Sequence, residues 1–149
     1  MHADYFVKTI HDFFNGNRSH NIMANFRYSL SDEKIEHLAA YYTSLKPRKT
    51  SGSITGNTAA GKQVADERCA GCHGPDGNSV TPTMPSLAGQ DAAYLVSQTQ
   101  QYRDGQRKNS LMHGVVAHLK DKNIVDAAAY FASQKPQHAR PDAGLSAQE

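Results

Sequence analysis

The stretch "ERCAGCHGPDG", residues 67–77, contains both cysteines of the 149-residue chain, Cys69 and Cys72, and His73 follows them directly. A disulfide between these cysteines would close too short a loop to stabilise a fold. A structural zinc site normally takes ligands in two separated pairs, and the sequence contains no second cysteine pair. A thioredoxin-like redox site would follow a strand, and the flanking residues do not form a strand pattern.

The pattern Cys-x-x-Cys-His favours covalent attachment of haem, with zinc or redox chemistry as the remaining alternatives. Residues three or four positions apart share one face of a helical turn. Both sulfurs of Cys69 and Cys72 can therefore reach one edge of a porphyrin, and the imidazole of His73 can reach its iron. We predict one haem c per chain.

A second axial ligand is expected downstream, where the candidates are Met84, Met112, His113 and His118. A methionine ligand raises the redox potential relative to a second histidine. Met84 follows His73 so closely that it would have difficulty reaching the opposite face of the haem. Met112 lies between two predicted helices, where a loop can approach that face, and we predict that it is the ligand. His113 and His118 are expected to face solvent or to form hydrogen bonds.

The elements that must position these residues are short helices and long loops. No strand pattern occurs, so the predicted fold class is all-α. Asp91 is predicted to cap a helix, and Pro136 is predicted to end one. The expected segments are a helix over 57–73 capped by Asn57 or Thr58, a loop over 74–90, a helix over 91–108, an irregular segment over 109–119, a helix over 120–135 and a flexible tail over 137–149.

The motifs Cys-x-x-Cys-His-Gly-x-Asp-Gly, Pro-x-Leu-Ala-Gly-Gln, Tyr-Leu, Arg-x-Gly-x-Arg and Met follow one another over residues 57–136. This stretch resembles class I cytochrome c, in particular the tandem di-haem cytochrome c-four kind. The resemblance implies thioether bonds at Cys69 and Cys72 and axial ligation by His73 and Met112. It also implies a fold in which short helices wrap around the haem and the first and last helices cross.

Further residue roles follow from the same resemblance. Gly61 and Tyr130 are expected at the helix crossing, where a small residue lets an aromatic ring approach. Arg103 and Arg107 are expected to pair with the haem propionates, although solvated charges at a helix end remain an equal alternative. Haem-binding residues are also expected at Pro85, Leu87 and Tyr130.

Residues 3–47 repeat residues 92–136 at a shift of 89 positions, with 15 identities over 45 positions and no gap. Tyr5, Arg18 and Met23 are among the identities; they correspond to Tyr94, Arg107 and Met112. Such a repeat predicts tandem domains. We therefore expect residues 1–47 to be the haem-less C-terminal half of a truncated first domain, residues 48–56 to be a linker and residues 57–136 to be a complete mono-haem domain.

The two helices expected within residues 1–47 would each carry an apolar face that needs a cover. These faces contain Tyr5, Phe6, Phe13 and Phe14 on one helix and Ile35, Leu38, Tyr41 and Tyr42 on the other. The cover could be the haem domain of the same chain or a second copy in a homodimer. In an exchange between two chains, Met23 could even reach the partner's iron.

The composition limits the function classes. The net charge is +2, and no run of like charges supports nucleic-acid binding. No apolar stretch is long enough to span a membrane, so at most a peripheral association is expected. The mean hydropathy is −0.64, and a chain so poor in apolar residues could use a bound haem as its core.

The resemblance implies a non-enzymatic periplasmic electron carrier with transient redox partners. Its donor would be a quinol-oxidising complex or a dehydrogenase, and its acceptor a terminal oxidase. One alternative is a dedicated subunit of a dehydrogenase such as one that oxidises sulfur compounds. Another is a sensor or enzyme whose sixth haem ligand is labile. The N-terminal residues do not resemble an export signal, so we expect Met1 to be a truncation or expression start.

Overall fold

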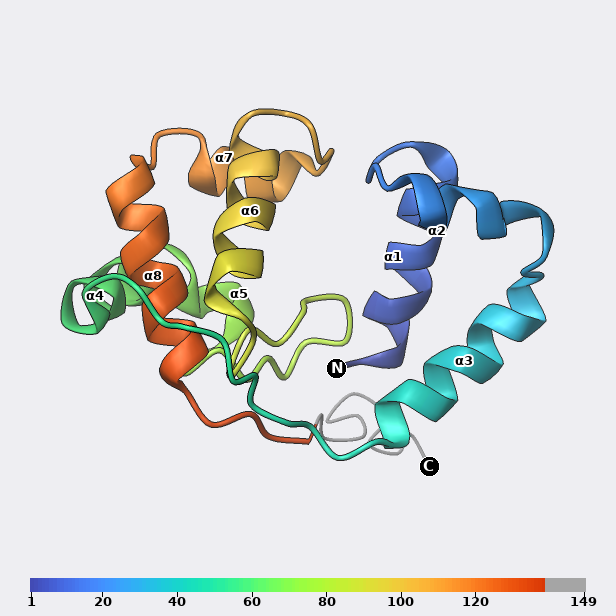
Figure 1. The fold of residues 1–149 in the computed structure, drawn as a ribbon, viewed down its shortest axis with the longest axis horizontal. Coiled ribbons are helices and arrows are strands. Elements are labelled where there is room, and N and C mark those ends of the chain that lie inside the picture. Colours follow the sequence, from blue (N-terminus) through green and yellow to red (C-terminus); the bar gives the residue numbers. More distant parts are fainter. Residues whose placement is uncertain (139–149) are drawn as a thin grey trace, which may run out of the picture.

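A computed structural model describes residues 1–138, and within this range the chain is helical and contains no strand (Figure 1). The predicted all-α fold is therefore confirmed. Two long segments without a helix, 45–57 and 74–91, and several short loops connect the helices. The elements in chain order are α1 (Ala3–Asn15), α2 (Asn21–Asn25), the 3₁₀ helix η1 (Phe26–Tyr28), α3 (Asp32–Ser44), α4 (Thr58–Arg68), α5 (Ala70–His73), α6 (Ala92–Arg103), α7 (Ser110–Val116) and α8 (Asp121–Ser133).

Local capping signals fix several helix starts. The Asn57 side chain accepts hydrogen bonds from the backbone N–H groups of Ala59 and Ala60, both at 3.0 Å, and so begins α4. The Asp91 carboxylate accepts one from the Tyr94 N–H at 2.8 Å, as predicted for the start of α6. The predicted single helix over 57–73 is wrong, because the backbone turns at Cys69 (φ −116°) and separates α4 from α5.

The segment over 109–119, predicted to be irregular, instead contains α7. Its cap is Asn109, whose side chain accepts a hydrogen bond from the Met112 N–H at 3.0 Å. A two-turn helix that includes Gly114 is too short to show apolar periodicity, which explains why the pattern missed it. The last helix, α8, ends at Ser133 rather than at residue 135, so the chain is already extended at Gln134, before Pro136 restricts it.

Helices α4 and α8 pack against each other, as the expected crossing requires (Figure 1). Gly61 makes this approach possible, because a Cβ there would lie 1.8 Å from the carbonyl oxygen of Asp126. The atoms nearest to Gly61 are thus the backbone of α8 at Asp126 and Ala127, whereas an aromatic ring was expected. The hydroxyl of Tyr130 instead donates a hydrogen bond to the carbonyl of Pro75 at 2.8 Å.

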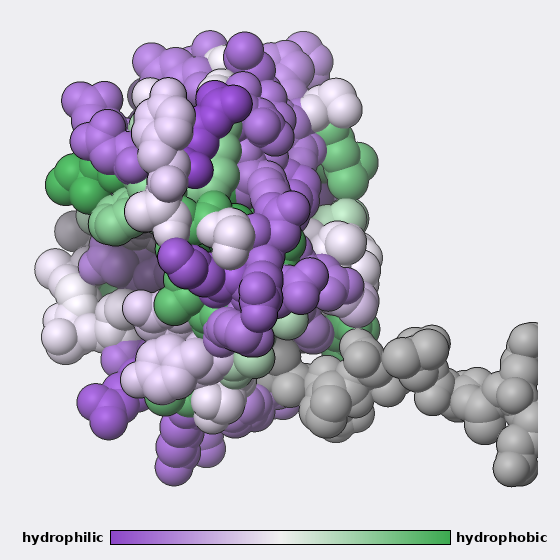
Figure 2. Space-filling view, turned by 90° about the vertical axis from the view of Figure 1, so that its right-hand side faces the viewer, coloured by the Kyte–Doolittle hydropathy of each residue, from purple (hydrophilic) through white to green (hydrophobic). Residues whose placement is uncertain are grey.

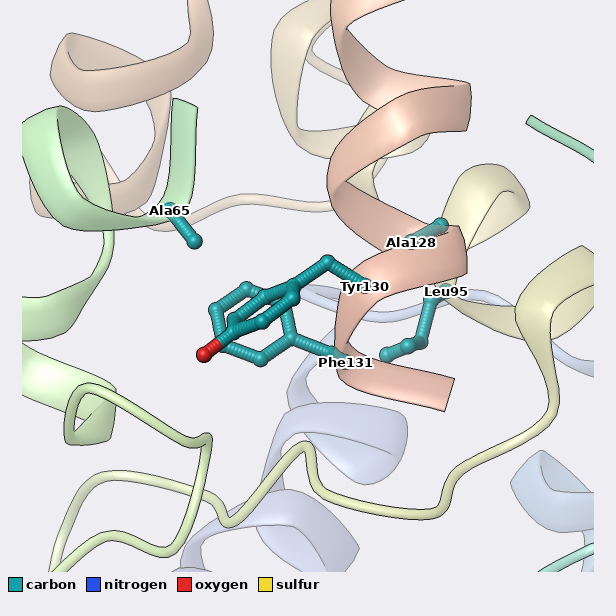
Figure 3. Close-up of a cluster of buried hydrophobic side chains, with 5 residues drawn as sticks. All are labelled: Ala65, Leu95, Ala128, Tyr130 and Phe131. Carbon is teal, nitrogen blue, oxygen red and sulfur yellow. The ribbon is translucent and has the colours of Figure 1, made fainter. Parts of the chain in front are cut away.

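The apolar core beneath this crossing is small (Figure 3). Figure 3 shows side chains from three helices that meet there: Ala65 of α4, Leu95 of α6, and Ala128, Tyr130 and Phe131 of α8. Three of these five residues also line the large cavity described below. The helices α4–α8 therefore enclose a cavity together with a modest core.

The N-terminal segment (residues 1–47) forms a second helical layer, in which α1 packs against α3. Ile10, Ile35 and Ala39 are buried, and the rings of Phe6 and Tyr42 stack with their centroids 5.5 Å apart. In Figure 1, α1 lies between α3 and the helices α4–α8. Tyr5, Phe6 and Ile10 of α1 line the cavity described below, and the choice between the two covers considered for the apolar faces stays a prediction.

Residues 48–56, predicted as a linker, contain no helix and bond to the later part of the chain. The Thr50 N–H donates to the carbonyl of Gly89 at 2.9 Å, and the Lys49 ammonium donates to the carbonyl of Ser133 at 2.8 Å. These bonds attach the segment to the loop before α6 and to the end of α8. The domain boundaries at 47 and 57 stay predictions.

The outer surface of the N-terminal segment contains both hydrophobic and hydrophilic residues (Figure 2). Figure 2 shows this side, where hydrophobic residues lie scattered among hydrophilic ones. Tyr41 and Tyr42 are 59% and 47% exposed, so part of the apolar surface expected from the sequence does remain in solvent. Within residues 1–138, no helix is both long and apolar enough to cross a bilayer. The predicted flexible tail lies almost entirely outside the described residues.

Candidate haem site

A cavity of about 500 Å³ lies between the helices α4–α8 and the N-terminal segment. The residues singled out from the sequence meet at its walls. Cys69, Cys72, His73, Met112 and Arg107 all line it, although they come from separate parts of the chain. The fold therefore brings the predicted cysteines, histidine and methionine to one space.

His73 is 5% exposed and belongs to the single turn of α5. Its Nδ1 lies 2.8 Å from the carbonyl of Pro85, and because a carbonyl only accepts, Nδ1 carries the proton. The buried Nε2 is then an unprotonated lone pair, and it has no hydrogen-bond partner within the described residues. Burial lowers the pKa of His73, and the bond to Pro85 partly opposes this shift. A neutral, oriented imidazole with a free Nε2 is a metal-binding imidazole.

Cys69 and Cys72 are half-buried free thiols at the cavity wall. Burial, with a smaller contribution from Cys72, raises the pKa of Cys69 to about 11. Cys69 therefore stays protonated at neutral pH, unlike a reactive redox thiolate. Within residues 1–138, no group of three or more histidine, cysteine, aspartate or glutamate side chains could hold a metal ion. The zinc alternative thus receives no support.

Two of the candidate ligands line the cavity, Met112 in α7 and Met84 in the loop after α5, and Met1 is a third methionine in its wall. The structure therefore brings both candidate thioethers to the site, and the choice of Met112 stays a prediction. Neither His113 nor His118 lines the cavity, and Nδ1 of His113 bonds to the carbonyl of Tyr102 at 3.0 Å. Met23 also lies outside this cavity.

Apolar side chains form most of the remaining wall. Pro85 and Leu87, both expected from the resemblance, are among the lining residues. The other apolar contributors include Leu95, Val116, Ile124 and Phe131. Tyr130 is not among them; its ring belongs to the core cluster, and its expected contact with haem has no support in this geometry.

The two arginines of the Arg-x-Gly-x-Arg motif separate in the structure. Arg107 is 4% exposed and lines the cavity, with its guanidinium 4.5 Å from the centre of the Tyr102 ring. Arg103 lies outside the cavity and pairs with Asp104 at 2.9 Å and with Asp121 at 2.7 Å. For Arg103, the alternative of a charge at a helix end fits this position better than a contact with a propionate.

The N-terminal segment contributes lining residues that the sequence analysis did not assign to the site. They are Met1, Tyr5, Phe6, Lys8, Thr9, Ile10 and Arg18. The sequence contained an indication for two of them: Tyr5 and Arg18 are identical to their counterparts in the repeat, Tyr94 and Arg107. The repeat predicted a second domain of the same kind, but not which face of it meets the cavity.

Comparison with known proteins decides the family. The sequence profile of cytochrome c matches residues 58–135. The chain belongs to the cytochrome c family. Cytochrome c4 of Pseudomonas aeruginosa is 45% identical over 93 residues, which are 62% of this chain and 46% of that protein. The chain thus spans about half the length of this relative.

A second relative extends through the N-terminal segment. A thiosulfate dehydrogenase electron acceptor of Stutzerimonas stutzeri is 34% identical over 145 residues, which cover 88% of this chain and 67% of that protein. Among solved structures, cytochrome c4 of Acidithiobacillus ferrooxidans has a TM-score of 0.76 at 27% identity, covering 89% of this chain and 84% of the other. Thiosulfate dehydrogenase of Marichromatium purpuratum has a TM-score of 0.81 at 32% identity. The match covers 89% of this chain and 31% of that chain.

The cofactor of this cytochrome is haem c, attached through Cys69 and Cys72. The geometry fits this group. Two thiols line an apolar cavity together with His73, whose buried Nε2 lacks a partner in the part of the chain that the structure describes. A buried polar atom without a partner is costly, and an iron ion would satisfy it.

Proposed function

We propose that this protein is a one-electron carrier whose single haem c has His73 and Met112 as its axial ligands. This proposal rests on Nε2 of His73, which has no hydrogen-bond partner within residues 1–138, and on the cavity that both His73 and Met112 line. Haem c, when bound, supplies a one-electron iron couple. Two protein ligands would leave no open position for a substrate, which favours electron transfer over catalysis or gas sensing.

The residues of the chain would hold the haem in one electronic state and one orientation. The carbonyl of Pro85 keeps the proton of His73 on Nδ1, which leaves Nε2 available as a ligand. The capping bond from the Met112 N–H to Asn109 fixes the first turn of α7, from which the Met112 side chain projects. The apolar wall that includes Leu87 and Phe131 would exclude water from the iron.

The relatives support a dehydrogenase as the electron donor. Two thiosulfate dehydrogenase electron acceptors match this chain over 145 and 143 residues, so the likeness includes the N-terminal segment. We therefore favour a sulfur-compound dehydrogenase as the donor, with the N-terminal segment as part of the docking surface. A free shuttle between a quinol-oxidising complex and a terminal oxidase is the second candidate, and the cytochrome c4 relatives support it.

Location and assembly follow as further parts of the proposal. Covalent haem attachment favours the periplasm, where the redox partners of such a carrier would be found. Contacts with these partners would be small and transient. A homodimer through residues 1–47 stays a prediction, as does ligation by Met23 in such a dimer.

The axial ligands can be tested with a matched pair of variants, Met112→Ala and Met84→Ala. The oxidised wild-type holoprotein should show the weak far-red absorption band of iron–thioether ligation. We expect Met112→Ala to lose this band and to bind carbon monoxide rapidly when reduced, since its iron would have an open position. Met84→Ala should retain the band and should resist carbon monoxide.

The opposite pattern, with the band lost only in Met84→Ala, would show that Met84 is the ligand. Rapid carbon monoxide binding by the wild-type protein would favour the sensor or enzyme alternative instead. Titration with a purified sulfur-compound dehydrogenase and its substrate would test the donor. If the haem is reduced no faster with the dehydrogenase than without it, the dehydrogenase is not the electron donor.

A further inference from the structure

Two arginines from distant parts of the chain converge at the cavity. Arg18, from the N-terminal segment, donates a hydrogen bond to Oε1 of Gln98 at 3.0 Å. Arg107, from the loop after α6, donates to the same oxygen at 2.8 Å. Both arginines line the cavity. They are also counterparts in the internal repeat, because their numbers differ by 89.

The contacts around these arginines are reciprocal. Arg107 donates to the hydroxyl of Tyr5 at 3.1 Å, and Arg18 donates to the hydroxyl of Tyr94. Tyr5 and Tyr94 are themselves counterparts at the same shift of 89. The arginine of each half of the repeat thus donates a hydrogen bond to the tyrosine of the other half. The N-terminal segment is therefore placed by a specific, nearly two-fold contact at the edge of the cavity.

The positive charge at this contact has no ion-pair partner among the described residues. Among residues 1–138, neither Arg18 nor Arg107 forms an ion pair with a carboxylate. Asp12 of α1 is already bonded to Lys8 and to Asn17. Arg107 is 4% exposed, and its Nε is buried without a partner within the described residues. Buried charge is costly unless an opposite charge accompanies it, so the contact calls for an anion in the cavity.

We propose that Arg18 binds the haem propionates together with Arg107, so that the N-terminal segment is part of the haem site and raises the reduction potential. This inference rests on the proposed haem carrier, whose two propionates supply the required anions. For Arg107 a propionate contact was expected from the resemblance; the role of Arg18 and of its segment is new. Arginine matches a carboxylate with a planar pair of donors, which suits this role.

The effect on the potential follows from charge. Reduction removes one positive charge from the iron, and a neighbouring guanidinium stabilises the reduced state relative to the oxidised state. By linkage, the reduced haem must in turn hold the N-terminal segment more tightly, by the same factor. The docking of residues 1–47 and the redox state of the haem are therefore coupled.

The test compares Arg18→Gln with Arg27→Gln in the full-length holoprotein, by spectroelectrochemical titration. Arg27 is an exposed arginine of the same segment, does not line the cavity and gives the same change of charge. We expect Arg18→Gln to shift the one-electron equilibrium about three- to tenfold towards the oxidised form, where a tenfold change is about 59 mV. Arg27→Gln should shift it less than about twofold, because its charge is screened by solvent.

Two further variants separate charge from docking. Arg18→Lys keeps the charge and should stay close to the wild-type potential. Tyr5→Phe removes the hydrogen bond to Arg107 without changing any charge; where the segment stays docked, its potential should lie closer to wild type than that of Arg18→Gln. Amide hydrogen exchange over α1 would show whether the segment remains docked in each variant.

Unchanged potential in haem-loaded Arg18→Gln would refute this inference alone. An equal loss of potential in Tyr5→Phe, with amide exchange over α1 unchanged, would also refute it, because the loss would then occur while the charge of Arg18 is still in place. A chain that carries no covalent haem, as judged from its mass, would instead refute the proposed function and this inference with it.

Discussion

The close approach of α4 to α8 predicts that Gly61→Ala strongly destabilises the protein. A Cβ at position 61 would lie 1.8 Å from the carbonyl oxygen of Asp126 and 2.4 Å from its carbon, so one of the two helices must move. Overpacking of this kind costs about 3 kcal/mol. The helix propensity gained from alanine returns at most about 1 kcal/mol. We expect a net loss of about 2 kcal/mol in the free energy of unfolding, measured by denaturant titration of the holoprotein.

Gly114→Ala is the matched control, because it makes the same substitution within a helix where no atom lies within 4 Å of the added Cβ. It should leave stability unchanged or raise it by up to about 1 kcal/mol. If Gly61→Ala unfolds at the same denaturant concentration as Gly114→Ala, the two helices do not meet at this glycine. The account of the crossing would then be wrong.

Two further predictions concern the bonds that tie loops to α8. Asp126→Asn should lower stability at neutral pH and flatten the acid limb of the pH–stability curve. The N–H of Asn57 and the side chain of Lys122 lower the pKa of Asp126, so its contribution is present above the unfolded pKa of about 4 and is lost as the pH falls through the folded value. Thermal unfolding at several pH values measures this, and a parallel acid limb would contradict it. Tyr130→Phe should lose about 1 kcal/mol of unfolding free energy, because the carbonyl of Pro75 loses its bond; stability equal to wild type in denaturant titration would show that this bond contributes nothing.

Local features of the site could be predicted from the sequence. The spacing of Cys69, Cys72 and His73 identified the haem site, and the cap at Asp91 set the start of α6, because both depend on residues close in the chain. The helix α7 was missed, although its cap, Asn109, stands directly before it. A single short helix gives too few apolar positions for periodicity to show.

The resemblance predicted the crossing of α4 and α8, but the other long-range features could not be predicted. Arg103 and Arg107 are equivalent in a sequence motif, and only the fold shows that Asp121 pairs with the first while the second enters the cavity. The meeting of Arg18 with Gln98 joins residues 80 positions apart. The repeat indicated that Arg18 has a counterpart, but it carried no information on how the two halves pack.

The central claim is that one haem is bound covalently at Cys69 and Cys72, and intact mass under denaturing conditions tests it most directly. The account predicts the mass of the polypeptide plus one haem, which peptide mapping places on the segment that contains both cysteines. A Cys69→Ser, Cys72→Ser double variant should lose the added mass. A wild-type chain with the mass of the polypeptide alone, or with two free thiols after expression with a haem-attachment system, would contradict the account.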